Sequence, residues 1–78
     1  MLKYRMIEET PTRVVYEYYP EHDKEGGIIA YDKANDKIEV IKLAPRDEFR
    51  WYAGHLFSYI FKFKKNNEFK KEGMIAWY

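Results

Sequence analysis

The spacing of apolar residues changes at Pro45, and this change restricts the chain to one class of fold. Before Pro45, apolar and polar residues alternate over several short segments, which is typical of strands with one buried face. After Pro45, apolar residues recur every three or four positions, which is typical of an amphipathic helix. The sequence therefore predicts an α+β domain. In it, an antiparallel β-meander of three to four strands is packed by one helix from the C-terminal half, and a short apolar strand or tail follows.

The expected strands cover residues 13–19, 28–33 and 37–43, with a weaker candidate over residues 1–9. In the first of these, Val15 falls on the more exposed face, while the buried face contains Val14, Tyr16 and Tyr18.

The second and third strands form a predicted hairpin whose register is set by its loop. A four-residue loop over 33–36 pairs Asp32 with Lys37, an opposite-charge pair at the strand ends. It also places four apolar residues on one face, namely Ile29, Tyr31, Ile38 and Val40. A three-residue loop would split this set between both faces, so the four-residue register is favoured.

The helix is expected near residues 46–65, with Pro45 at its first position, where a missing N–H costs nothing. Its apolar stripe, predicted to pack on the hairpin face, consists of Phe49, Ala53, Leu56, Ile60 and Phe63. Tyr52 and Tyr59 flank the stripe on one side, and Phe57 and Phe61 flank it on the other. The apolar arc then spans about 200°, whereas a helix covering a small sheet needs only about 100° or somewhat more. The helix is therefore expected to have apolar surface to spare.

Seventy-eight residues make one domain, 1–78, with a core that is barely sufficient for stability. Small folds of this size usually need a disulfide, a metal or a partner chain. The chain has no cysteine, and only His22 and His55 could bind zinc through nitrogen, so neither a metal nor another cofactor is expected. The supports that remain are large rings (eight Tyr, five Phe and two Trp) and oligomerisation.

The sequence also predicts a cytoplasmic protein without a membrane segment. The N-terminus lacks the apolar region of a signal peptide. The longest uncharged run, Trp51 to Phe61, has eleven residues, and a membrane span needs about 20.

Neither histidine has the neighbours of a catalytic residue. His55 has Ser58 three positions later but no acidic residue four positions away on its helix, so we interpret it as a surface residue. His22 lies among acidic residues whose spacing does not fit a calcium loop. We therefore expect no enzyme activity, and a catalytic site would have to be built across a dimer.

The expected function is that of a non-catalytic interaction domain, as a homodimer or with another protein. The candidate interface residues are the apolar ones left over by the sheet: Trp51, Phe57, Phe61, Met74, Ile75, Trp77 and Tyr78. Three arrangements of the tail, residues 73–78, remain open. It docks on Phe57 and Phe61 of its own chain, it meets them across a two-fold axis, or it pairs with a sheet edge of a neighbour.

The alternative function is nucleic-acid binding by a basic stretch near the C-terminus. Its residues are Lys62, Lys64, Lys65, Lys70 and Lys71, with one acid, Glu68, among them. Lysines interleaved with phenylalanines suit phosphate contacts and base stacking. However, the stretch is short, lacks arginine and fits no known nucleic-acid-binding motif.

Overall fold

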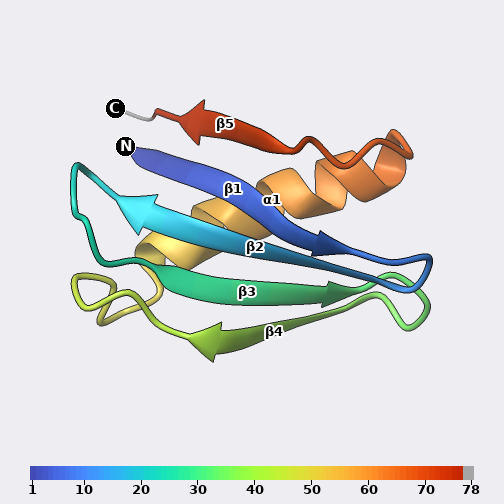
Figure 1. Ribbon diagram of the computed structural model, residues 1–78, viewed down its shortest axis with the longest axis horizontal. Helices are drawn as coiled ribbons and strands as arrows, with labels where there is room; N and C mark the ends of the chain where they lie inside the picture. The colour runs from blue at the N-terminus through green and yellow to red at the C-terminus, as the bar shows by residue number, and fades with distance from the viewer. Residues whose placement is uncertain (77–78) are drawn as a thin grey trace.

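In the computed structural model of the protein, which describes residues 1–76, one antiparallel sheet packs against one helix (Figure 1). The five strands are β1 (Leu2–Glu9), β2 (Arg13–Pro20), β3 (Gly27–Asp32), β4 (Lys37–Lys42) and β5 (Glu72–Ile75). The helix α1 (Trp51–Lys65) lies between β4 and β5 in the chain. The predicted α+β meander, packed by one helix and followed by a short C-terminal strand, is confirmed.

The strand order is β4-β3-β2-β1-β5. Each of the first three strands pairs antiparallel with the next one in the chain. After α1 the chain returns, and β5 pairs antiparallel with β1. The described tail is thus a strand of its own chain's sheet, and the two edges of that sheet are β4 and β5.

The β3–β4 hairpin has the predicted register. Asp32 lies opposite Lys37 and Ile29 lies opposite Val40, which leaves a four-residue loop. Asp36 in this loop has a φ of 54°, a left-handed conformation that aspartate tolerates better than most residues. The loop chemistry and the alternation of apolar residues therefore agree on one register.

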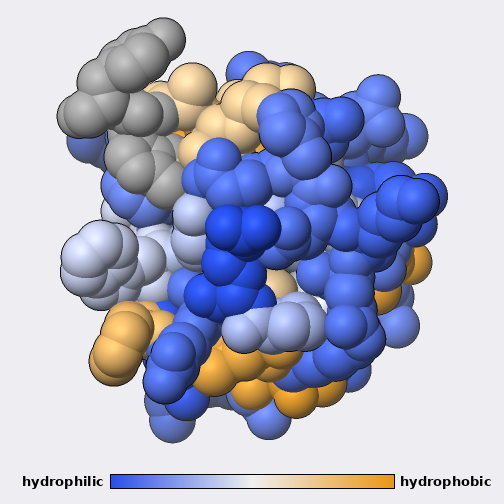
Figure 2. Space-filling model, turned by 90° about the vertical axis from the view of Figure 1, so that its left-hand side faces the viewer, coloured by the Kyte–Doolittle hydropathy of each residue, from blue (hydrophilic) through white to orange (hydrophobic). Residues whose placement is uncertain are grey.

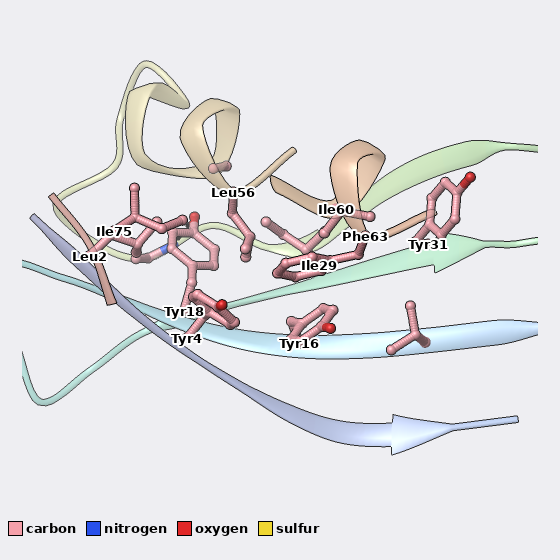
Figure 3. Packing of buried hydrophobic residues seen from close by; sticks show 13 residues of the cluster. Leu2, Tyr4, Tyr16, Tyr18, Ile29, Tyr31, Leu56, Ile60, Phe63 and Ile75 are labelled. Carbon is pink, nitrogen blue, oxygen red and sulfur yellow. Dashed lines mark hydrogen bonds between the residues drawn. The ribbon is translucent and has the colours of Figure 1, made fainter. Parts of the chain in front are cut away.

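The core lies between α1 and the facing side of the sheet (Figure 3). Its helix residues are Ala53, Leu56, Ile60 and Phe63, as predicted, and its largest fully buried sheet residues include Tyr16, Tyr18 and Tyr31. The hydroxyl group of each of these three tyrosines has a hydrogen-bond partner. Tyr16 donates to the carbonyl oxygen of Lys70 at 2.6 Å, Tyr18 to Asp47 Oδ2 at 2.8 Å, and Tyr31 to the carboxylate of Asp36. The core thus combines ring burial with satisfied polar groups.

The predicted start of the helix is wrong. The helix begins at Trp51, not near residue 46, because Asp47 folds back as a turn in which its N–H bonds to the carbonyl oxygen of Ala44. Asp47 is 1% exposed, and its carboxyl oxygens accept the N–H groups of Tyr52 and Ala53 at 3.0 and 2.9 Å. Phe49, predicted to lie in the core, precedes the helix and is 75% exposed.

Two predictions about burial in the sheet also need correction. Val15, expected on the exposed face, is only 5% exposed, because it lies on an inner strand between Glu8 of β1 and Ala30 of β3. Ile38 and Val40, expected in the core, are only half-buried, because they lie on an edge strand.

Candidate interaction surface

The two flanks of the α1 stripe have different surroundings. On one flank, Tyr52 donates a hydrogen bond from its hydroxyl group to Glu21 Oε2 at 2.7 Å, and Tyr59 packs against the core. On the other flank, the ring of Phe61 packs edge-on against Tyr31, with 6.0 Å between the ring centroids, yet Phe61 remains 45% exposed. The surplus apolar surface of the helix therefore lies on the Phe61 flank, toward β3 and β4.

Phe57 belongs to the same flank. It precedes Phe61 by four residues, a spacing that places both side chains on one side of a helix, and it is partly buried against the core. Tyr31, the neighbour of Phe61, lies opposite Ile38 of β4. The flank therefore approaches the edge of the sheet that β4 forms.

The helix leaves β4 largely uncovered. In Figure 1, α1 runs behind β1 and β2, and β4 lies outside its outline. The helix-facing residues of β2 are fully buried, whereas Ile38 and Val40 of β4 are half-buried and Ile41 is 48% exposed. We call Ile38, Phe57 and Phe61 the β4 margin. It combines an unpaired strand edge with adjacent apolar side chains.

Phe49 and Trp51 are the two most exposed large apolar residues in the described part of the chain, each 75% exposed. They stand on either side of Arg50, whose φ of 61° is left-handed. Trp51 lines an open hollow of about 350 Å³ on the outer side of α1, together with Gly54, His55 and Ser58. Trp51 is therefore a solvent-exposed side chain at the start of α1.

Figure 2 shows the end of the molecule that lies at the left of Figure 1. Most of this end is hydrophilic. Hydrophobic surface gathers at the top, on the side of β5, and at the bottom, on the side of β4. On this end of the molecule, the hydrophobic surface therefore lies toward the two edges of the sheet, with hydrophilic surface between them.

The described tail lies far from the Phe61 flank. Ile75, a predicted interface residue, is 2% exposed and pairs with Leu2, so it belongs to the core. Met74 is 54% exposed, but β5 is the sheet edge opposite to β4. Trp77 and Tyr78, also predicted interface residues, lie outside the described residues. The tail through residue 76 pairs with β1 and does not dock on Phe57 and Phe61 of its own chain, which is one of the three arrangements that the sequence leaves open.

The basic stretch surrounds the C-terminal end of α1. Lys62, Lys64 and Lys65 occupy the last turn of the helix, and Lys70 and Lys71 precede β5. Lys64 Nζ donates to the carbonyl oxygen of Lys33 at 3.0 Å, and Lys62 Nζ lies 5.0 Å from the centroid of the Tyr59 ring. At least two of the five ammonium groups thus have contacts within the fold.

Among the described tyrosines, the largest upward pKa shifts belong to three that are buried in the core. Burial, followed by the hydrogen bond to Asp47, raises the pKa of Tyr18 to about 12. Burial, followed by the bond to Asp36, raises the pKa of Tyr31 to about 12. Burial also raises the pKa of Tyr16. These groups stay protonated at neutral pH, and their hydroxyl protons are donated to partners within the fold.

The described residues contain no group of three or more acidic, histidine or cysteine side chains placed to hold a metal ion. No helix in this part of the chain has the length and apolar character needed to cross a membrane.

The sequence analysis missed β4 as a candidate surface. The pattern Lys-Ile-Glu-Val-Ile-Lys over 37–42 contains a usable signal, because charges at both ends and in the middle are typical of an edge strand. The exposure of Phe49 had no such signal, since its spacing from Ala53 fits a continuous helix.

Comparison of the chain with protein-family models, with curated proteins and with solved structures finds no match.

Proposed function

We propose that this protein is a non-catalytic interaction domain that forms a homodimer through the β4 margin. One observation carries the proposal: the half-exposed ring of Phe61 packs on Tyr31 of β3, next to β4, which has a strand neighbour on one side only among the described residues. An unpaired strand supplies backbone N–H and C=O groups for pairing, and an adjacent apolar ring supplies surface that water solvates poorly. Closed two-fold dimers are the commonest oligomers of identical chains, and in such a dimer the same edge of each copy can pair with the other.

The test compares two exposed apolar residues at opposite edges of the sheet. Phe61 and Met74 are 45% and 54% exposed, and they lie toward β4 and on β5, respectively. We expect sedimentation velocity at micromolar concentration to give about twice the chain mass for the wild type and for Met74→Ser. Phe61→Ser should sediment as a monomer. Circular dichroism verifies that both variants keep the fold.

A wild type that sediments as a monomer throughout the micromolar range would contradict the proposal. A dimer that Met74→Ser dissociates and Phe61→Ser leaves intact would move the interface to the β5 edge and contradict it equally.

A further inference from the structure

We propose that two copies pair antiparallel through β4, with Ile38 on the two-fold axis, so that the two sheets join into one continuous sheet. This inference rests on the proposed homodimer and specifies its register. It follows from three properties of β4: the alternation of its faces, the order of its charges and the position of its bulge.

The faces of β4 limit the registers that are allowed. Ile38 and Val40 lie opposite Tyr31 and Ile29, so their side chains are on the helix side of the sheet. Lys37 and Glu39 are therefore on the open side. In an antiparallel pair, directly opposite residues share a face. A two-fold joint within this segment must accordingly be centred on one of its four residues.

Charge excludes two of these centres. Centring the axis on Lys37 would put the two copies of that lysine opposite each other, and centring it on Glu39 would do the same with the carboxylates. Like charges directly opposite each other destabilise a pair of strands. Centring the axis on Ile38 instead places Lys37 opposite Glu39 of the second copy, and symmetry repeats this opposite-charge pair on the other side.

The β-bulge at Ile41 argues against the remaining choice, an axis centred on Val40. The pairing between β3 and β4 shifts between Ile28 and Ile29, which leaves Ile41 as an extra residue between Val40 and Lys42. A joint centred on Val40 would run across this irregularity, where the strand twists away from a neighbour. A joint centred on Ile38 uses the regular N-terminal part of β4. Charged residues usually protect an edge strand, but the order Lys-Ile-Glu makes them complementary in this one register.

The apolar contacts agree with the same register. A two-fold axis perpendicular to the joined sheets keeps both helices on the same face. The two copies of Ile38 then meet on the helix side, beside Tyr31 and the Phe61 ring that packs on it. The register therefore brings the half-exposed flank of each helix to the same side of the joint.

The test separates the register from dimerisation itself. Lys37→Glu places a glutamate opposite Glu39 of an identical copy, and Glu39→Lys places a lysine opposite Lys37. Each variant alone should dimerise about tenfold more weakly than the wild type. In an equimolar mixture, both pairs become complementary again, so we expect a heterodimer with wild-type affinity by sedimentation or by native mass spectrometry. Thermal melting verifies that each variant is folded.

Cysteine cross-linking gives a second readout, since the chain contains no cysteine. Under mild oxidation, a mixture of Lys37→Cys and Glu39→Cys should form the mixed disulfide in preference to either homodimer. Met74→Cys, on the opposite edge, is the matched control and should stay uncross-linked. If the wild type dimerises but both charge variants dimerise as well as it does, the register is wrong and the homodimer stands. The register is also wrong if their mixture gains no affinity. If the wild type is a monomer, both proposals fail.

Discussion

Asp47 caps α1 from outside the helix: its Oδ2 atom accepts the N–H of Ala53 at 2.9 Å, although the residue next to the helix start is Arg50. An ordinary N-cap side chain belongs to the residue that adjoins the first turn. Here the chain makes an additional turn between Asp47 and Arg50, and the carboxyl group returns to the helix end. The hydroxyl group of Tyr18 in β2 holds the same oxygen at 2.8 Å, so the cap also joins the helix to the sheet.

We expect Asp47→Ala to lower the free energy of unfolding by roughly 2–4 kcal/mol. The substitution removes the acceptor of two helix N–H groups and of a buried tyrosine hydroxyl group. Urea unfolding followed by circular dichroism measures the change. Glu48→Ala is the matched control, because Glu48 is the exposed acidic neighbour, and it should change the free energy by less than about 0.5 kcal/mol. Equal losses for the two variants would contradict the role of Asp47.

The β3–β4 hairpin and the Asp47 cap show which parts of the fold could be predicted from the sequence and which could not. The register of the β3–β4 hairpin follows from local alternation and loop chemistry, so Asp32 and Lys37 were paired correctly. The helix start depends on Tyr18, which is 29 residues from Asp47 in the chain, and no local pattern reports that contact. The apolar spacing from Phe49 to Ala53 therefore predicted one turn of helix too many.

The candidate surface was predictable only in part, for the same reason. Phe57 and Phe61 were assigned to one flank by helical spacing alone, and Phe61 is exposed on the side of β3 and β4. The docking of the tail could not be predicted from its composition, because Met74 and Ile75 are both apolar. The pairing of Ile75 with Leu2 buries one of them and leaves the other exposed, and that pairing is a long-range contact.

Two members of the sequence-predicted stripe should respond differently to the same kind of truncation. Leu56 is fully buried, so Leu56→Ala should cost roughly 2–5 kcal/mol of unfolding free energy. Phe49 is 75% exposed, and Phe49→Ala should change it by less than about 0.5 kcal/mol. Thermal or urea unfolding of both variants checks this pair of expectations. A large loss from Phe49→Ala would mean that the ring is covered in solution.

We expect the protein to lose stability between about pH 10 and pH 12. The pKa values of Tyr18 and Tyr31 in the fold are raised to about 12, whereas an unfolded tyrosine titrates near pH 10. The folded state therefore holds these protons more tightly, so the stabilisation is complete below pH 10 and is lost as the pH rises through the folded values. Unfolding free energies measured across this range should fall.

Tyr31→Phe should make the fall in unfolding free energy above pH 10 less steep, because it removes one of the two tyrosines whose pKa is raised to about 12. Absorbance titration near 295 nm provides an independent readout, in which part of the tyrosine signal should appear only together with unfolding. If all eight tyrosines titrate near pH 10 while the fold persists, the burial of these hydroxyl groups is wrong.

Salt-dependent binding by the lysines of the basic stretch distinguishes the proposed interaction domain from the alternative, a nucleic-acid-binding protein. We expect no appreciable retention of the protein on single- or double-stranded nucleic acid at physiological salt. Phosphate binding by these lysines would instead weaken steeply between about 50 and 200 mM salt. It would also be abolished by changing Lys65, Lys70 and Lys71 to Glu. A submicromolar, salt-sensitive affinity that this triple variant removes would establish the alternative function.

Substitution by alanine should raise the stability of the fold at Gly54 and lower it at Gly73. A Cβ atom on Gly54, inside α1, would have no heavy atom within 4 Å apart from its own helix and chain neighbours. Alanine is a better helix former than glycine, so Gly54→Ala should stabilise the fold by about 0.5–1 kcal/mol. For a domain of this size, that corresponds to a melting temperature higher by roughly 2–8 °C.

Gly73 of β5 lies directly opposite Tyr4 of β1, and a Cβ atom there would come within 2.5 Å of the Tyr4 hydroxyl oxygen. The Tyr4 ring has little room to move away, because it is 5% exposed and packs edge-on against Tyr16 at 5.7 Å. Gly73→Ala should therefore push β5 from β1 or displace the ring, and cost about 1–3 kcal/mol. Parallel melting curves of the two alanine variants test both signs at once. If Gly73→Ala were neutral, β5 would not be held against β1 as closely as the structure shows.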